Sequence, residues 1–142
     1  MGISKASASW QGGFKDGKGT MKGGHAPEAT FSAGTRFEGQ EGSNPEELIG
    51  AALAGCFSMA LTLGLEKAGL QPKRVDTTAD VKLERLETGF TITGIDLVTK
   101  AIVPGADAAK FQQIAEETKK GCPVSKVLAA TKINLTATVS NG

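Results

Sequence analysis

The sequence predicts an α+β fold, and three patterns carry that prediction. Short segments separated by glycine clusters fill residues 1–42, which is typical of a β-meander. The uncharged run Leu48–Leu65 follows helix-capping signals and indicates one long helix. Beyond it, segments rich in threonine and β-branched residues alternate with a helical pattern. We expect a single domain over residues 1–142, with the meander in 1–42 and a mixed helix and sheet part in 43–142.

The first segment contains a turn signal rather than a nucleotide site. Asp16-Gly17 lies between two candidate strands and predicts a tight turn. Gly12, separated by four residues from Gly17-Lys18, comes close to a phosphate-binding loop, but Gly19 stands where that loop needs Ser or Thr. No apolar strand precedes it and no helical pattern follows. We therefore interpret this stretch as a turn of the meander.

The long helix has clear signals at both ends. Ser43 with Glu46, and Asn44 with Glu47, form two overlapping capping boxes around a proline that suits the first turn. Gly69 fits the position just after the helix. The helix predicted from these signals has about 23 residues and is roughly 35 Å long.

This helix is apolar on every side, so it needs to be buried on every side. Its glycine, serine and threonine residues and the lack of flanking basic or aromatic belts argue against a membrane span. The rest of one chain is too small to cover all its faces, which predicts a two-fold homodimer with these helices at its centre. Small residues four apart would allow close backbone approach: Gly50 with Ala54, Ala51 with Gly55, and Ala60 with Gly64.

The remaining pattern predicts two strands joined as a hairpin, then a helix, a short helix and a last strand. The hairpin turns at Glu87-Thr88-Gly89, and Asp107 and Gly121 are the expected caps of the next helix. The expected elements are strands at Val75–Leu86 and Phe90–Val103, helices at Asp107–Lys120 and Pro123–Ala129, and a strand at Lys132–Val139.

Composition and charge exclude several functions. The 16 basic residues nearly cancel the 15 acidic ones, and no basic cluster indicates nucleic-acid binding. The only histidine, His25, lies in a glycine-rich loop far in sequence from both cysteines, so we expect no metal site and no Cys-His or Ser-His catalytic pair. The first residues contain no apolar stretch of signal-peptide length, and we expect a cytoplasmic protein with reduced thiols.

The two cysteines are the strongest candidates for chemistry. Cys56 lies in the middle of the apolar helix, where it is either a small buried hydrophobic residue or a protected nucleophile. Cys122 follows a helix and precedes another, beside lysines that favour a thiolate, although an incidental loop thiol fits the same position. Such a pair suggests a peroxidatic and a resolving thiol, if the fold brings the two together.

A cation is needed to ionise a thiol in the apolar helix, and Arg36 is the nearest arginine in sequence. An ion pair at ~4 Å in a dielectric of ~20 is worth about 4 kcal/mol, or roughly three pKa units. This exceeds a moderate desolvation loss, so the pKa of Cys56 would fall near or below neutrality, but only if the guanidinium is fixed beside the sulfur. Glu46 either caps the helix, holds Arg36 by a bidentate contact, or does both.

These segments together resemble the family of osmotically inducible protein C and organic hydroperoxide resistance protein. The resemblance extends over essentially the whole chain, and the segment after Pro45 favours the osmotically inducible branch. The segments that carry it are Thr35–Gly39, Asn44–Ile49, Ala54–Ala60 and Gly121–Ser125.

The resemblance implies a cysteine-based peroxidase, built as an intertwined homodimer whose sheets wrap around two central helices. It implies that Cys56 is the peroxidatic thiolate and that Cys122 is the resolving thiol. Arg36 would stabilise the thiolate and clamp the hydroperoxide, and Glu46 would orient Arg36. Phe37 and Phe57 would give apolar surroundings that favour organic hydroperoxides over hydrogen peroxide.

The implied cycle needs no cofactor or metal. Cys56 would become a sulfenic acid, Cys122 would condense with it to a disulfide, and an external dithiol, dihydrolipoamide-like in this family, would restore both thiols. Two alternatives use the same residues: a redox sensor or disulfide oxidoreductase acting on protein partners, and a non-catalytic stress-induced dimer with inert thiols.

Overall fold

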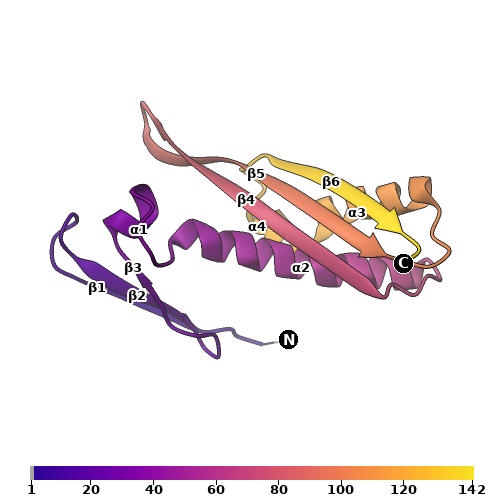
Figure 1. The fold of residues 1–142 in the computed structure, drawn as a ribbon, viewed down its shortest axis with the longest axis horizontal. Helices are drawn as coiled ribbons and strands as arrows, with labels where there is room; N and C mark the ends of the chain where they lie inside the picture. Colours follow the sequence, from indigo (N-terminus) through magenta and orange to yellow (C-terminus); the bar gives the residue numbers. More distant parts are fainter. Residues whose placement is uncertain (1) are drawn as a thin grey trace. The chain divides into compact units, whose positions relative to one another are not determined.

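The computed structural model describes residues 2–142 and shows an α+β fold (Figure 1). The chain divides into two compact units, one up to Glu47 and the other from Leu48 to Gly142. Each unit contains one three-stranded sheet. The expected single-domain organisation stays a prediction.

The N-terminal unit contains the predicted meander. The strands β1 (Ala6–Gln11), β2 (Lys18–Gly23) and β3 (Ala29–Phe31) pair antiparallel in sequence order. The connection between β1 and β2 is tight, since the Gly17 N–H donates to the Gly13 carbonyl at 2.7 Å. The turn interpretation of this stretch is therefore confirmed.

A short helix, α1 (Ala33–Phe37), replaces the expected end of the meander. Ser32 caps it, because the Ser32 hydroxyl accepts from the Thr35 N–H at 3.1 Å while the Thr35 hydroxyl accepts from the Ser32 N–H at 2.9 Å. This reciprocal pair has threonine where a capping box usually has Glu or Gln, and so the sequence signal was missed. The consequence is that Arg36 projects from a helical turn.

The long helix α2 spans Pro45–Lys67, as predicted. The Asn44 side chain accepts from the Glu47 N–H at 2.9 Å, which confirms one of the two expected capping pairs. The other does not form, because Ser43 donates to the Glu47 carboxylate instead and Glu46 binds Arg36. Past the end of the helix, Gly69 has a φ of +83°, a conformation that glycine adopts without strain.

The C-terminal unit contains the predicted hairpin and a strand whose partner the sequence did not reveal. The strands β4 (Arg74–Leu86) and β5 (Gly89–Ile102) pair antiparallel, and β6 (Ile133–Ser140) pairs parallel with β5. A parallel neighbour needs a crossover connection, which the segment between β5 and β6 provides. That segment contains α3 (Ala108–Gly121) and α4 (Pro123–Val127).

The core of this unit lies between α2, α3 and the sheet. The side chains of Phe57 and Phe111 are fully buried in it, and Ser58 on α2 donates to Thr77 on β4 at 2.8 Å. One apolar row of α2 faces this core: Leu53, Phe57, Leu61 and Leu65, all at 0% exposure.

The opposite side of α2 remains exposed within one chain. Leu48, Met59 and Leu63 are 44%, 78% and 52% exposed, so the expected burial on every side is met on one side only. By length and composition alone, α2 would also be able to cross a membrane. Its packed row shows that it serves as a core helix of this fold.

The junction of α3 and α4 differs from expectation at one residue. Asp107 caps the start of α3, as predicted, by accepting from the Lys110 N–H at 3.0 Å. Gly121, the expected residue beyond its end, is the last helical residue instead. Cys122 ends α3 and also caps the start of α4, so this cysteine is fixed by two helices at once.

Candidate functional site

Cys56 occupies the middle of α2, where its half-buried side chain packs against the core of the C-terminal unit. Cys122 belongs to that core and is only 2% exposed. The two thiols are free and lie close enough for each to shift the pKa of the other. The structure therefore brings together the two cysteines that lie 66 residues apart in the sequence.

Cys122 has a second set of partners in the first turn of α4. The Ser125 N–H donates to Cys122 Sγ at 3.4 Å, and the Ser125 hydroxyl lies 3.2 Å from the same sulfur. Sulfur here takes the place that a serine or aspartate oxygen usually takes at a helix start. The sequence analysis assigned no role to Ser125. The available signal was its position three residues after Cys122, the residue that caps α4.

The two thiols differ in how their surroundings affect ionisation. Burial raises the pKa of Cys56, and the neighbouring Cys122 raises it further, whereas the backbone of Val124 opposes the increase. Burial also acts against the thiolate of Cys122, but hydrogen bonds from Ser125, from Cys56 and from the Val124 backbone outweigh it and lower the pKa of Cys122.

These directions bear on one expectation. Burial and the neighbouring Cys122 raise the pKa of Cys56 in the reduced pair, as the interpretation of a buried thiol implies, and the lowering expected from a guanidinium fixed beside the sulfur stays a prediction. The physical reason is the apolar helix around the sulfur together with a neighbouring thiol that holds negative charge more easily. The lowered pKa belongs to Cys122, as its position between two helices suggested.

Arg36 and Glu46 form an ion pair within the N-terminal unit. Arg36 Nε donates to Glu46 Oε1 at 3.0 Å and to Oε2 at 3.3 Å, and Nη2 also donates to Oε1. Glu46 is 6% exposed, so the carboxylate is held in a dry environment where a charge-assisted contact is strong. The predicted contact between these residues is confirmed, and Glu46 holds the guanidinium from the first turn of α2.

The two phenylalanines expected near the site have different surroundings. Phe37 is 37% exposed, its ring centroid lies 5.4 Å from Arg36 Cζ, and Phe14 lies beside it at 6.2 Å between ring centroids. Phe14 and Phe37 line one cavity of about 360 Å³. Phe57 is fully buried in the core of the C-terminal unit, so in this conformation it contributes packing rather than a wall that a ligand touches. The sequence analysis missed Phe14, which lies in the glycine-rich turn.

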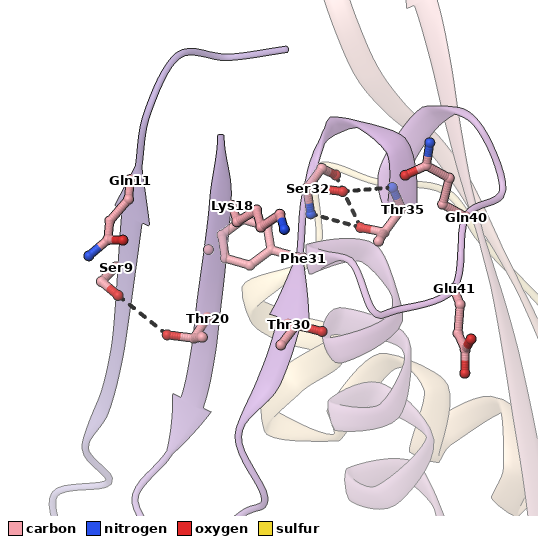
Figure 2. Close-up of a pocket in the computed structure, with 11 residues that line it drawn as sticks. Ser9, Gln11, Lys18, Thr20, Thr30, Phe31, Ser32, Thr35, Gln40 and Glu41 are labelled. Atoms are coloured by element: carbon pink, nitrogen blue, oxygen red, sulfur yellow. Dashed lines mark hydrogen bonds between the residues drawn. The ribbon is translucent and has the colours of Figure 1, made fainter. Parts of the chain in front are cut away.

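A separate cavity of about 590 Å³ lies along the meander and α1 (Figure 2). Its lining includes several hydroxyl side chains, of which those of Ser9 and Thr20 are hydrogen-bonded to each other at 3.3 Å. Lys18 and Glu41 contribute the charged groups. Neither cysteine lines it, and neither does Arg36 or Glu46, so it is distinct from the four residues expected to carry the chemistry.

The arrangement of the two sulfurs suits two-electron thiol chemistry. A close thiol pair in which one sulfur is half-buried and the other is held by hydrogen bonds to Ser125 is suited to forming and breaking a disulfide. Across residues 2–142, the structure contains no group of three or more His, Cys, Asp or Glu side chains placed to hold a metal ion.

Comparison with known proteins gives consistent relatives. Residues 38–137 match the family described as OsmC-like protein. The chain is 52% identical over 128 residues to Peroxiredoxin OsmC of Escherichia coli, with 89% of this chain and 90% of that protein covered. It is 32% identical over 104 residues to the organic hydroperoxide resistance protein of Xanthomonas axonopodis, with 72% and 68% covered.

Solved structures show the same fold. An organic hydroperoxide resistance protein from Elizabethkingia anophelis superposes with a TM-score of 0.71 at 26% identity over 99% of both chains. The OsmC-like protein from Mycoplasma pneumoniae has a TM-score of 0.76 at 16% identity, with 97% of each chain covered. The higher identity to the peroxiredoxin places this chain nearer the OsmC branch than the hydroperoxide resistance branch. From the family match and the sequence identities, the chain belongs to the OsmC-like protein family.

Proposed function

We propose that this protein is a thiol-dependent peroxidase that reduces organic hydroperoxides, and hydrogen peroxide more weakly, to alcohols or water in defence against oxidative and osmotic stress. The observation that carries the proposal is the close pair of free thiols, Cys56 in the middle of α2 and Cys122 at the junction of α3 and α4, each of which shifts the pKa of the other. The names of the relatives, a peroxiredoxin and a hydroperoxide resistance protein, support the same chemistry.

The proposed cycle starts at Cys56. Its thiolate attacks the distal peroxide oxygen, the O–O bond breaks, and the alcohol leaves with a proton while the sulfur becomes a sulfenic acid. The Cys122 thiolate then attacks that sulfur and displaces hydroxide, which takes up a proton from solvent and leaves as water, and the Cys56–Cys122 disulfide forms. An external dithiol, dihydrolipoamide-like, reduces the disulfide, so the protein itself requires no cofactor.

Arg36 supplies the positive charge that the cycle needs. Because burial raises the pKa of Cys56, an ionised nucleophile requires a cation close to the sulfur at the moment of attack. We place the Arg36 guanidinium there, oriented by Glu46 and binding the hydroperoxide, while Phe37 provides apolar contact for an organic substituent. Glu46 is then a positioning residue, because it acts through Arg36.

We also propose that two copies form an intertwined homodimer around their α2 helices, with the sheets wrapped outside. The support is the apolar side of α2 left exposed in one chain, at Leu48, Met59 and Leu63. Of the three small-residue pairs expected at the contact, only Ala51 with Gly55 is exposed. The other two are partly occupied by the chain itself, since a Cβ at Gly50 would lie 3.3 Å from Val81 and one at Gly64 would lie 3.0 Å from Ile114. A cytoplasmic location would keep both thiols reduced at rest.

The proposal is tested by peroxide consumption. Protein mixed with dihydrolipoate and cumene hydroperoxide should consume peroxide, and Cys56→Ser should abolish the activity. Cys122→Ser should allow a single oxidation and leave a sulfenic acid that dimedone captures. No peroxide consumption by the unmodified protein would refute the peroxidase, and oxidation of thiols in a partner protein without peroxide turnover would favour the redox-sensor alternative.

A further inference from the structure

We propose that Ser125 positions Cys122 as the leaving thiolate when the Cys56–Cys122 disulfide is reduced, so that the external dithiol attacks the sulfur of Cys56. This inference rests on the proposed function, because it concerns the second half of that cycle. It assigns a role to Ser125 and fixes which of the two sulfurs the reductant meets. Three features of the C-terminal unit support it.

The first feature is the geometry around Cys122 Sγ. Ser125 is 5% exposed, and two of its groups are directed at one sulfur, the backbone N–H at 3.4 Å and the hydroxyl at 3.2 Å. Both belong to the first turn of α4, which Cys122 itself caps. Donors fixed in this way favour negative charge on the sulfur that they face.

The second feature is the difference between the two thiols in ionisation. Burial acts against the thiolate of Cys122, but the Ser125 hydrogen bonds, with smaller contributions from Cys56 and the Val124 backbone, lower its pKa, whereas burial raises the pKa of Cys56. In thiol–disulfide exchange the thiol of lower pKa leaves faster. The difference in pKa therefore favours Cys122 as the leaving thiolate and a new bond between the external thiol and Cys56.

The third feature is access. Cys56 is half-buried and Cys122 is 2% exposed, so an external thiol reaches Cys56 more easily. A surface cavity of about 370 Å³ does lie beside the α3–α4 junction, between Lys120 and Lys126, but its lining includes Ser125 and not Cys122. Ser125 thus lies between that cavity and the sulfur.

The exchange is balanced without any further reactant. A thiolate of the external dithiol attacks Cys56 Sγ, the Cys56–Cys122 bond breaks, and Cys122 leaves as a thiolate that receives the Ser125 hydrogen bonds. The second thiol of the reductant then attacks its own sulfur in the mixed disulfide and releases Cys56. Two electrons pass from the dithiol to the protein, and the reductant departs as a disulfide.

The first experiment locates the mixed disulfide. The protein disulfide is made with diamide, so that neither hydroperoxide nor peroxidase activity enters the test. The oxidised protein is treated briefly with glutathione, quenched in mildly acidic urea with excess N-ethylmaleimide, and digested with trypsin. The two sulfurs separate into the peptides Phe37–Lys67 and Gly121–Lys126. We expect glutathione on the Cys56 peptide and maleimide on the Cys122 peptide; glutathione on Cys122, or equally on both, would overturn the inference.

The second experiment tests Ser125 directly. Ser125→Ala should slow reduction of the diamide-made disulfide by dihydrolipoate about three- to ten-fold, since a hydrogen bond to the leaving thiolate is lost. Ser125→Thr should retain most of the rate. Thr118→Val is the matched control, because the Thr118 hydroxyl is also buried in this region but donates to the Ile114 carbonyl.

If Ser125 only stabilised the fold, replacing it would not change the ionisation of Cys122. The ultraviolet absorbance of the thiolate, titrated against pH in a Cys56→Ser background, should show a higher midpoint for Ser125→Ala than for unmodified Ser125. The Thr118→Val control should leave that midpoint in place. Equal midpoints in Ser125→Ala and its parent would contradict the proposed role, even if the variant reduced more slowly.

Discussion

At the scale of single residues, the surroundings of each thiol favour a different protonation state. The apolar side chains around Cys56 disfavour its thiolate, whereas the donors of Ser125 favour that of Cys122. A protonated Cys56 reacts slowly with oxidants, because the thiolate is the nucleophile. In the proposed cycle Arg36, held by Glu46, ionises Cys56 when a hydroperoxide binds.

Burial and the neighbouring Cys122 determine how the alkylation of Cys56 depends on pH. Because the pKa of Cys56 is raised, its reaction with iodoacetamide should increase only as the pH rises above the ordinary thiol range. Cys122→Ser removes the thiol that contributes to the increase, so the midpoint should move to lower pH while staying elevated by burial. Peptide mass spectrometry of Phe37–Lys67 measures the rate at each pH, and an unchanged or higher midpoint would argue against the coupling.

The carboxylate of Glu46 is expected to act through Arg36. Glu46→Gln should lower kcat/KM for cumene hydroperoxide about ten-fold or more, since the charge-assisted contacts to the guanidinium are weakened. Glu47→Gln is a close control, because it removes a carboxylate from the same helix start without touching Arg36. Equal losses in both variants would show that the effect comes from the helix start rather than from Arg36.

The residues of the site were predictable to different degrees. Residue type singled out Cys56 and Cys122, because the sequence contains two cysteines, whereas Arg36 and Glu46 were chosen for their positions before the long helix and took their roles from the family resemblance. The lowered pKa of Cys122 agrees with its position between two helices, whereas the direction for Cys56 was open, since it depends on which groups face that sulfur. Ser125 was missed for the same reason: its role depends on a capping geometry that only the fold creates.

At the scale of elements, local signals predicted the helices that have strong caps. The bounds of α2 followed from its capping residues and from Gly69, whereas α1 was missed because its capping pair uses Thr35. The antiparallel hairpin of β4 and β5 was visible in the sequence, since its turn is local. The parallel pairing of β6 with β5 joins distant segments and left no local pattern.

The start of α2 offers a stability test. Asn44→Ala removes the side chain that accepts from the Glu47 N–H, so the free energy of unfolding should fall by about 1 kcal/mol. Asn44→Asp keeps an acceptor at the helix start and should change stability by only a few tenths of a kcal/mol. Urea unfolding measures both, and a similar loss in the two variants would contradict the capping role.

At the scale of the whole molecule, the apolar composition of α2 is explained if a second copy of the chain covers its exposed side. One side of the helix forms the core of its own chain, and the other exposes large apolar side chains that a second copy would cover. The sequence predicted this need from the absence of charge in Leu48–Leu65, but only the structure shows which side is free.

A charge on the free side of α2 should separate the two copies. Met59→Lys places an ammonium group at a position that is 78% exposed in one chain, so the isolated fold should tolerate it while the dimer weakens. Sedimentation velocity should show the unmodified protein as a dimer and Met59→Lys shifted toward monomer. Val127→Lys, at a residue 83% exposed on α4, is the control and should remain dimeric. A dimeric Met59→Lys would place the interface elsewhere.

The most direct test of the account is the fate of the two sulfurs after one equivalent of cumene hydroperoxide. The fully reduced protein is oxidised, blocked with N-ethylmaleimide, digested with trypsin and analysed by mass spectrometry. The account predicts that peptides Phe37–Lys67 and Gly121–Lys126 become joined through a disulfide, and that Cys122→Ser instead yields a Cys56 peptide one oxygen heavier. Recovery of both cysteines as maleimide adducts, with the hydroperoxide unconsumed, would contradict it.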